Sequence, residues 1–371
     1  MYKVKIYGAG SIGNHLAHAC RSLQWDVLIC DKDAQALERT KSDIYPARYG
    51  RWDDAIRLCT IDQLPKEKFD LVIIGTPPDS HIPIALEVLK SETPKIILIE
   101  KPLCGPGLEG ASELLALSKE KNVFVGIGYN HTLTQNTREA TQILNQNSIG
   151  KPLSITAVTR EHWKGIFSAH PWLRGPQDTY LGFSSRGGGA TGEHSHAINI
   201  FQHFTNVLKL GRIVEVTANL NHVKTDEVSY DEIAFLTLKT EKGLMGNVTQ
   251  DVITEPSLKQ LRIQGSAGFL EWQVNFNSGV DRVSFQLEGN SKTQEKLISK
   301  TRSDDFKGEI IHIGELLGGT IKPEDSPISL ERGLETMMVI CATFISDELK
   351  RTVKINYEKG FNKAAISAFG V

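Results

Sequence analysis

The sequence predicts an α/β chain in which parallel βαβ units are followed by an α+β region with an antiparallel sheet. Between Lys3 and about residue 130, short apolar runs alternate with amphipathic helical stretches, which is typical of parallel βαβ units. From Ile213 to Leu287, strand-length runs follow one another with hairpin-like breaks, which is typical of an antiparallel sheet. We therefore expect two domains, residues 1–130 and residues 131–371.

The N-terminal region contains strand-like runs separated by helical stretches. Glycine, proline or charged residues bound each run, and the apolar residues of the stretches between them recur at intervals of three and four, as on one face of a helix. Parallel strands need such crossover connections. The runs cover residues 3–8, 25–30, 69–75, 95–100 and 122–128, and the clearest helical stretches cover residues 11–23 and 80–90.

The C-terminal region begins with a strand at residues 152–160 and a stretch rich in glycine, tryptophan and proline at residues 163–192. A helix follows, and then the strand-length runs. The break Glu241-Lys242-Gly243 between two of these runs predicts a hairpin. The tail returns to a helix over residues 329–350, where Ser329 is a suitable N-cap and Glu331 lies in the first turn.

Composition excludes several classes of partner. The 371 residues include 42 Lys and Arg against 44 Asp and Glu, without a block of like charges, so we expect neither nucleic acid nor a membrane surface as a partner. No apolar run approaches the roughly 20 residues of a membrane span, and the first residues lack the apolar segment of a secretory signal, so we expect a cytoplasmic protein. The five cysteines are scattered without a C-x-x-C pair, so we expect small buried side chains and no disulfide or thiolate zinc site.

A glycine-rich turn joins the first strand to the first helix. Gly8 permits a tight turn, Gly10 lets a pyrophosphate approach, and Gly13 lets the helix and strand pack closely. The phosphates of a dinucleotide would lie at the helix N-terminus, where unpaired N–H groups favour anions. The alternative interpretation is an ordinary glycine-rich turn. The predicted cofactor-binding residues of this turn are Gly8, Gly10, Ser11, Ile12 and Gly13.

The second strand ends at Asp31, 18 residues after Gly13, where an acid binds the hydroxyls of the adenosine ribose. The Asp31 carboxylate would repel a 2′-phosphate, which favours NAD over NADP as the cofactor. Lys32 beside it opposes this preference.

Two further strand ends carry candidate residues, because ligands of open parallel sheets bind beyond the carboxyl ends of the strands. Thr76-Pro77-Pro78 follows one run, and Glu100-Lys101-Pro102 follows the next. The first motif is alternatively a stop signal for the strand, and the second a solvated ion pair before a proline. The predicted cofactor-binding residues at these two ends are Thr76, Pro77, His81, Glu100 and Lys101.

Residues 193–204 have two distinct faces if they form one helix. At about 100° per residue, an apolar face lies beside a polar stripe. His194 and His196 also suggest a metal site, but residues two apart on a helix point about 200° apart, so we predict none unless the helix starts later. A buried structural histidine is the alternative for His196 and the favoured interpretation for His203. The apolar face comprises Ala197, Ile198, Phe201 and Phe204, and the polar stripe comprises Glu193, His196, Asn199 and His203.

Aromatic and arginine side chains gather before the glycine run at residues 187–189. Trp and Tyr faces stack on sugar rings and Arg pairs with carboxylate or phosphate, so this stretch fits one wall of a substrate site. A subunit interface rich in the same residues fits equally well. Tyr129 and Asn130 also fit a cleft, or alternatively an ordinary strand terminus with a turn-forming Asn. The predicted substrate-binding residues are Tyr129, Asn130, Trp163, Trp172, Arg174 and Asn199, and Tyr180 lies in the same stretch.

Several segments, in this order, resemble those of the Gfo/Idh/MocA oxidoreductases, which include glucose–fructose oxidoreductase and inositol 2-dehydrogenase. The segments are GAGSIG, GTPPDSH, IEKPL, GIGYN, GGGATGEHSHAIN and SLERGLETMMV, and they span nearly the whole chain. The resemblance implies an N-terminal Rossmann domain and a C-terminal α+β domain for substrate binding and oligomerisation, with an open, mostly antiparallel sheet. The substrate would lie between that sheet and the nicotinamide.

The resemblance also implies functional residues. The E-K-P motif of the family places its lysine at Lys101, and the glycine-rich run that ends in an acid and a histidine matches residues 187–189 through Glu193 and His196. The chain departs from the family at Glu193, where Asp is common, and at Asn199, where a second acid is frequent. The longer carboxylate of Glu193 would either orient His196 differently or contact the substrate.

Together these residues predict hydride transfer between NAD and a secondary alcohol, with Lys101, His196 and Glu193 as catalytic residues. His196 would be the general base in the oxidative direction, and Lys101 would stabilise the developing alkoxide. The resemblance implies a sugar, inositol or nucleotide-sugar substrate, and we expect a homodimer or homotetramer. The alternatives are an NAD-dependent glycosidase of the same family without net redox, and a non-catalytic nucleotide-sensing protein, against which the presence of both Lys101 and His196 argues.

Overall fold

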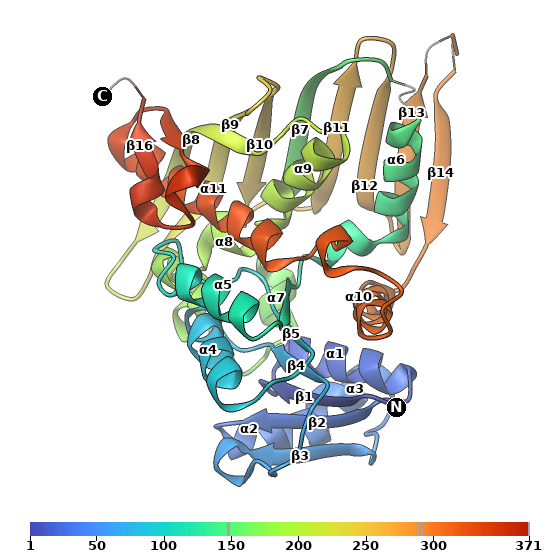
Figure 1. The fold of residues 1–371 in the computed structure, drawn as a ribbon, viewed down its shortest axis with the longest axis vertical. Coiled ribbons are helices and arrows are strands. Elements are labelled where there is room, and N and C mark those ends of the chain that lie inside the picture. The colour runs from blue at the N-terminus through green and yellow to red at the C-terminus, as the bar shows by residue number, and fades with distance from the viewer. Residues whose placement is uncertain (147–148, 288, 291, 370–371) are drawn as a thin grey trace.

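Two β-sheets occupy opposite ends of the molecule, with helices between and around them (Figure 1). The computed structural model describes residues 1–146, 149–287, 289–290 and 292–369. A parallel Rossmann-type sheet uses strands from the N-terminal region, and an open, mostly antiparallel sheet uses strands from the C-terminal region. The predicted fold class is therefore confirmed.

The first sheet is six-stranded and parallel, in the order β3-β2-β1-β4-β5-β6. Its inner strands β4 and β5 are entirely buried, because helices cover both faces of the sheet. The strand order reverses between β1 and β4, where ligands of such sheets bind. Strand β3 lies outside the predicted runs because this edge strand is only partly buried and lacks a continuous apolar run. The strands are β1 Lys3–Tyr7, β2 Asp26–Asp31, β3 Ile56–Thr60, β4 Leu71–Ile74, β5 Ile96–Ile99 and β6 Phe124–Ile127.

Most connections between these strands contain α-helices, whereas β3 and β4 are joined by a loop with one 3₁₀ turn at Ile61–Gln63. The connection from β2 to β3 is irregular, because a π-helical turn at Thr40–Ile44 separates two short α-helices. Thr40 lies in this turn, and its hydroxyl donates to the carbonyl of Ala9 in the glycine turn. The helices are α1 Ser11–Ser22, α2 Ala34–Arg39, α3 Tyr45–Tyr49, α4 His81–Ser91 and α5 Ala111–Glu120.

The second sheet is ten-stranded, in the order β14-β13-β12-β11-β7-β10-β9-β8-β15-β16. Its strand pairs are antiparallel except for β7 with β10, and the predicted hairpin joins β9 to β10. Helices α6, α9 and α11 lie against one face (Figure 1). The strands are β7 Pro152–Arg160, β8 Ile213–Lys224, β9 Ser229–Thr240, β10 Met245–Asp251, β11 Leu258–Gly265, β12 Phe269–Asn277, β13 Val280–Gln286, β14 Gln294–Ser299, β15 Val353–Ile355 and β16 Ile366–Ala368.

The C-terminal helices connect the two sheets. Phe306, Ile310 and Ile313 of α10 belong to the hydrophobic cluster of α1 and β1, so a helix late in the sequence covers the first sheet. We still propose a domain boundary at residue 130. Helix α10 belongs to the second region in sequence but packs against the first sheet. Ser329 caps α11 as predicted, since its side chain accepts the N–H of Arg332. The helices of this region are α6 Gln135–Asn145, α7 Lys164–Ser168, α8 Gly189–Glu193, α9 His196–Val207, α10 Arg302–Leu317 and α11 Leu330–Leu349.

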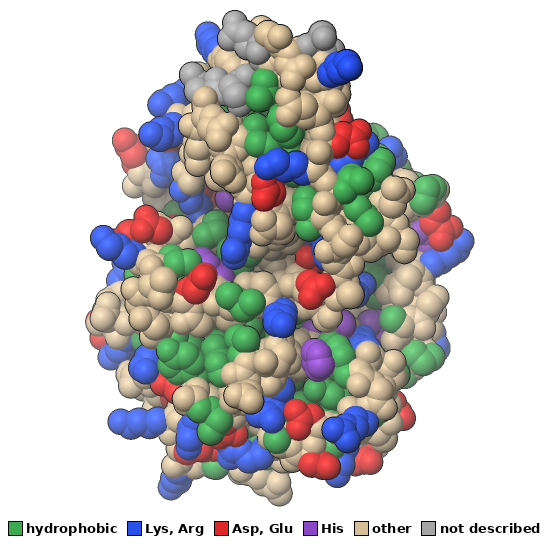
Figure 2. All heavy atoms as spheres, turned by 90° about the vertical axis from the view of Figure 1, so that its right-hand side faces the viewer, with side chains coloured by type: hydrophobic (Ala, Val, Ile, Leu, Met, Phe, Trp, Pro, Cys, Tyr) green, Lys and Arg blue, Asp and Glu red, His purple; other side chains and the backbone are tan. Residues whose placement is uncertain are grey.

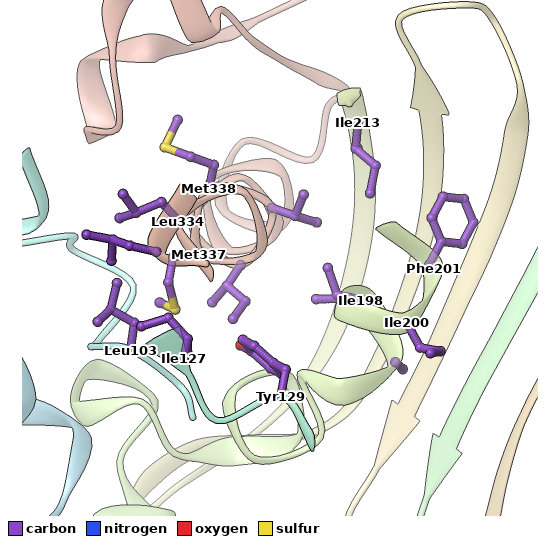
Figure 3. Packing of buried hydrophobic residues seen from close by; sticks show 14 of the residues in the cluster. Leu103, Ile127, Tyr129, Ile198, Ile200, Phe201, Ile213, Leu334, Met337 and Met338 are labelled. Carbon is purple, nitrogen blue, oxygen red and sulfur yellow. The ribbon is translucent and has the colours of Figure 1, made fainter. Parts of the chain in front are cut away.

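A large hydrophobic cluster joins the end of β6 to α9 and α11. Figure 3 shows the ring of Tyr129 among side chains of all three elements, including Ile127, Ile198 and Met337. This packing fixes the turn after β6 relative to α9, on which His196 lies.

The structure also bears on the cysteines and on membrane-spanning helices. Four cysteines are buried, Cys59 is half-buried, and none forms a disulfide. Within the described residues, none of the helices combines the length and the apolar character that a membrane span requires.

Candidate active site

The glycine turn after β1 has the geometry that a dinucleotide diphosphate needs. A Cβ atom added at Gly13 would lie 2.0 Å from the carbonyl oxygen of Gly8, so α1 approaches the turn as closely as only glycine permits. A Cβ atom added at Gly10 would meet no atom within 4 Å, so the space beside the turn is open to a ligand. Ser11 and Ile12 begin α1, which puts their N–H groups at the positive end of the helix dipole. The residues present therefore fit the diphosphate of NAD.

Asp31 ends β2 beside this turn. Its carboxylate accepts the N–H of Ala9 at 2.8 Å and the N–H of Asp33 at 3.0 Å, which holds it next to the glycine turn. A carboxylate offers about four acceptor positions, so Asp31 retains capacity for ribose hydroxyls. Lys32 is exposed next to it.

The loops after β4 and β5 lie side by side at the carboxyl edge of the first sheet. They carry Thr76 and Pro77 on one side, and Glu100 and Lys101 on the other. The ring of His81 joins the two loops, with its nitrogens 2.6 Å from the carbonyl of Thr76 and 3.0 Å from that of Pro102. Because His81 is completely buried, we assign it to holding these loops in place rather than to cofactor contact.

Lys101, which follows β5 of the first sheet, contacts Glu193 at the end of α8. Lys101 Nζ donates to the backbone carbonyl of Glu193 at 2.9 Å and lies 3.1 Å from Glu193 Oε2. The Tyr180 hydroxyl donates to the same Oε2 at 3.1 Å. Burial opposes ionisation of Glu193, but the Lys101 charge and these hydrogen bonds keep the pKa of the Glu193 carboxyl below its ordinary value. Burial and the Glu193 charge raise the pKa of Tyr180 well above its ordinary value, so Tyr180 is a hydrogen-bond donor here.

A close approach of backbone brings Glu193 to Lys101. Gly187 has a φ of +90°, and a Cβ atom there would lie 2.9 Å from Cβ of Pro78 in the loop after β4. A Cβ atom at Gly105 would lie 2.4 Å from the carbonyl of Ser185. The segment before α8 therefore packs directly on the loops of the first sheet. Figure 2 shows the molecule hollowed between its two ends, with acidic and basic side chains around the hollow.

Glu100 is a second buried carboxyl beside Lys101. Its Oε2 accepts the N–H of Lys101 at 3.3 Å, and its Oε1 is buried without a hydrogen-bond partner among the described residues. Burial outweighs the Lys101 charge and raises the pKa of Glu100 to about 7. The pKa values of Glu100 and Glu193 are thus shifted in opposite directions although both carboxyls are close to Lys101.

His196 begins α9 and stacks on His131. The ring centroids are 4.1 Å apart, and the ring of Tyr129 meets His196 edge-on at 5.7 Å. Nδ1 of His196 is buried and has no hydrogen-bond partner among the described residues. Burial, together with the charges of His131 and Lys101, lowers the pKa of His196 well below its ordinary value. The ring is therefore neutral near pH 7.

The polar stripe predicted along one helix is wrong because the helix is broken. Helix α8 ends at Glu193 and α9 begins at His196, with the glycine run in and before α8. Asn199 points to α11, where its side-chain amide donates to Thr336 at 3.1 Å. His203 lies 3.4 Å from the hydroxyl of Thr141 on α6. The residues of the predicted stripe therefore have different surroundings. The Asn199 side chain is buried and hydrogen-bonded to Thr336.

His194 and His196 have different partners. Nε2 of His194 lies 3.3 Å from the carbonyl of Glu161, whereas His196 stacks on His131. No group of three or more His, Cys, Asp or Glu side chains in the described part of the chain is placed to hold a metal ion.

The side chains of the aromatic stretch before α8 do not line one common surface. Trp163 is buried in a small cluster with Leu181, Ala190 and Val252, which lies behind α8. The Arg174 side chain is 79% exposed and pairs with Asp178 at 2.7 Å. Trp172 is half-exposed and lies over Arg39, 5.9 Å from the guanidinium carbon. The structure therefore does not bring Trp163, Trp172 and Arg174 together around Lys101.

Tyr129 and Asn130 lie at the turn after β6. The Tyr129 ring is buried in the cluster of Figure 3, and its hydroxyl donates to Ser195 at 3.2 Å, at the break between α8 and α9. Asn130 is half-buried and begins the single 3₁₀ turn Asn130–Leu133. Tyr129 therefore helps to hold His196 in place, through its hydrogen bond to the preceding Ser195 and its edge-on ring contact.

Sequence reasoning missed His131 and the ion pair of Lys259 with Glu161. His131 directly follows the candidate Asn130, so its position was the available signal. Lys259 Nζ lies 2.7 Å from Glu161, and its charge helps to lower the pKa of His196. Lys259 occupies an ordinary position of β11, and no motif marks it.

Comparison with known proteins supports the same family along most of the chain. Residues 2–129 match the model of the "oxidoreductase family, NAD-binding Rossmann fold", and residues 137–271 match the GFO/IDH/MocA C-terminal domain. No curated protein matches the sequence.

Solved structures of similar fold include levoglucosan dehydrogenase in complex with NADH (16% identity, TM-score 0.74, 95% of this chain and 98% of that chain). The WlbA dehydrogenase from Bordetella pertussis in complex with NADH and UDP-GlcNAcA is 18% identical, with a TM-score of 0.69 and the same coverage. A putative myo-inositol dehydrogenase from Sinorhizobium meliloti 1021 is 18% identical, with a TM-score of 0.71 over 95% of this chain and 99% of that chain. At these identities the likeness establishes the fold. The two family matches and the fold together show that the chain belongs to the Gfo/Idh/MocA family of NAD-binding oxidoreductases.

Proposed function

We propose that the protein is an NAD-dependent dehydrogenase that oxidises a secondary alcohol of a sugar, an inositol or a nucleotide sugar. The observation that carries the proposal is the contact of Lys101 with Glu193. This contact joins the end of a strand of the first sheet, the sheet that also carries the glycine turn and Asp31, to the turn that leads into His196. The ligands printed for the neighbours, NADH with L-sorbose in one case and NADH with UDP-GlcNAcA in another, support this substrate class.

The glycine turn and Asp31 would hold NAD, which when bound supplies the hydride acceptor. Ser11 and Ile12 would donate backbone N–H groups to the diphosphate, and Asp31 would accept ribose hydroxyls. These contacts lie at β1 and β2, apart from the strand end that carries Lys101. We expect them to set cofactor affinity without taking part in proton transfer.

Lys101 would donate a hydrogen bond to the substrate oxygen. An ammonium group has three N–H donors, and Glu193 accepts two hydrogen-bond contacts from Lys101 Nζ, one at its carbonyl and one at its carboxylate. One donor is left to stabilise negative charge as the alcohol loses its proton. We propose that Glu193 aims Lys101 and is itself a positioning residue.

His196 would accept the proton of the alcohol and return it in the reductive direction. Its lowered pKa keeps the ring neutral at physiological pH. The stacked ring of His131 and the edge of Tyr129 hold it in one orientation. Trp163, Trp172, Arg174 and Asn199 are not part of this proposed site, because each is buried elsewhere or paired elsewhere.

We also propose a homodimer or homotetramer. Exposed apolar side chains lie on strands of the ten-stranded sheet, among them Leu153, Phe235, Met245 and Leu297. Removing such side chains from water would favour association. Sedimentation velocity at two protein concentrations measures this directly, and a monomer at both would overturn it.

The test of the proposed function is a substrate screen. Free sugars, inositols and nucleotide sugars are incubated with the protein and NAD, and NADH formation is followed by absorbance. The same mixtures are examined for products formed without net reduction, which would indicate the glycosidase alternative. NAD binding without any turnover across the screen would indicate a sensor and contradict the dehydrogenase.

A further inference from the structure

Arg48 contacts the glycine turn, and Arg302 begins a helix that packs against α1. Arg48 of α3 donates from Nη1 to the backbone carbonyl of Ser11 at 2.8 Å and from Nη2 to the Ser11 hydroxyl at 2.7 Å. Arg302 is the first residue of α10. Neither guanidinium lies within 4.0 Å of a carboxylate oxygen in the described residues, and the Arg302 charge acts on Glu161 only from a greater distance, where it helps to lower the pKa of that carboxyl.

Helices α1 and α10 run in the same direction. The ring of His15 in the first half of α1 stacks on Phe306 in the first half of α10, with centroids 4.5 Å apart. Trp25, just past the end of α1, lies 3.2 Å from a Cβ atom built at Gly314 near the end of α10. The N-termini of two long helices therefore lie side by side, and each carries partial positive charge.

The cations near these N-termini are not neutralised by the acids closest to them in sequence. Asp304 is held by Thr301 in the capping box of α10. Asp305 pairs with Lys300 at 2.9 Å. Burial and the nearby Arg302 charge both lower the pKa of Arg48, which is the expected effect of like charges brought together. Two arginine side chains and two helix N-termini therefore lie close together, which favours binding of an anion.

We propose, building on the proposed NAD site, that Arg48 and Arg302 form a cationic clamp that binds the diphosphate of the dinucleotide beside the glycine turn. Arg48 contacts Ser11, the residue whose N–H begins the phosphate site, so its charge lies within the first turn of α1. Guanidinium groups suit phosphate because their N–H donors form a planar fork. The π-helical turn at Thr40–Ile44 reorients the chain before α3, on which Arg48 lies.

The test compares ligands with and without phosphate on variants of the intact protein. Arg48→Met is expected to weaken binding of NAD and ADP-ribose about tenfold, the factor typical of losing one hydrogen bond to a charged group. Binding of adenosine, which has no phosphate, should not change. Arg48→Lys should lose less than Arg48→Met, and Arg302→Met should lose several-fold. Calorimetry measures NAD and ADP-ribose, and ligand-observed NMR measures adenosine.

The matched control is Arg21→Met, because Arg21 lies near the other end of α1 and pairs with Asp53 at 2.9 Å. It should leave all three affinities unchanged. Raising the salt concentration should weaken NAD binding to the wild type more than to Arg48→Met, since the lost contact is ionic.

An NAD affinity of Arg48→Met equal to that of Arg21→Met would overturn the clamp. Equal weakening of adenosine and ADP-ribose would also overturn it, because the variant would then have disturbed the turn rather than a phosphate contact. Failure of the wild type to bind NAD would instead contradict the cofactor assignment, so the two failures are distinguishable.

Discussion

The glycine turn after β1 and the stretch between β7 and α8 are built in different ways. The turn consists of contiguous residues, and its chemistry is that of backbone N–H groups. The stretch makes contacts to distant residues, such as Arg186 with Asp79 at 2.9 Å and Tyr180 with Glu193. The first is fixed by local sequence, and the second by how the two regions pack.

This difference predicts how each region responds to mutation. Backbone donors survive most side-chain changes, so cofactor affinity is expected to be insensitive to substitutions in the cleft. Side-chain donors such as Lys101 have no substitute, so turnover is expected to be sensitive to single changes there.

The largest expected effect is on turnover after substitution of Lys101 or His196. Lys101→Met and His196→Ala should each lower kcat by about a hundredfold or more, the usual contribution of an oxyanion donor or a general base. NAD affinity should stay within about threefold, because the cradle at β1 and β2 is untouched. Steady-state kinetics on a confirmed substrate and calorimetry with NAD measure the two effects.

Matched controls exist for both variants. Lys95 lies at the opposite end of β5 from Lys101 and pairs with Asp70, so Lys95→Met should leave kcat unchanged. His203 lies on the same helix as His196 but contacts Thr141, so His203→Ala should retain kcat in the folded protein. A control variant that loses as much turnover as its partner would show that the effect is structural.

The next effect concerns the choice of cofactor. We expect the wild type to bind NAD more tightly than NADP because the Asp31 carboxylate would repel a 2′-phosphate. Asp31→Ser should narrow that difference about tenfold, which corresponds to about 1.4 kcal/mol of removed repulsion. Calorimetric titration with NAD and with NADP measures the ratio of the two affinities. Equal affinity of the wild type for NAD and NADP would contradict the role assigned to Asp31.

A smaller effect on stability is expected where α10 covers the first sheet. Glu309 is fully buried, and both its carboxylate oxygens have no hydrogen-bond partner among the described residues. Burial, with the charges of Glu100 and Asp305, raises the pKa of Glu309 well above its ordinary value. The unfolded chain then releases this proton at a lower pH than the folded protein, so the free energy of unfolding falls as pH rises above about 4.5.

The variant Glu309→Gln removes this titration. Between pH 5 and pH 8 it should lose less stability than the wild type, and Glu100 should account for part of the slope that remains. Urea unfolding at the two pH values measures the difference. Identical slopes for both proteins would mean that Glu309 is ionised in the folded state.

The smallest expected effect concerns Arg174, in the stretch between β7 and α8. Arg174→Ala should change kcat/KM by less than about twofold, because its exposed side chain pairs only with Asp178 and such surface pairs contribute little. A tenfold loss would return Arg174 to the substrate site that the sequence suggested.

The sequence predicts the parts of this molecule that depend on local pattern. The parallel runs, the capped helix at Ser329 and the glycine turn follow from apolar periodicity and from residues adjacent in the chain. The edge strand Ile56–Thr60 and the break between α8 and α9 do not, because one lacks a continuous apolar run and the other depends on glycine contacts with distant backbone.

The candidate site divides in the same way. Lys101, Glu193 and His196 were found through motifs, whereas their neighbours His131, Tyr180 and Lys259 are defined by packing between distant elements. The surroundings of the aromatic stretch depend on the same packing, since residue type alone does not tell whether Trp163 faces a substrate site or a small hydrophobic cluster.

The central claim is that Lys101 and His196 act on the same substrate oxygen. The most direct test is the double variant Lys101→Met/His196→Ala, compared with both single variants by kcat/KM on a confirmed substrate. If both groups act in one transition state, the double variant should be little worse than the poorer single variant. Losses that multiply would show that the two residues act independently, and the shared site proposed here would be contradicted.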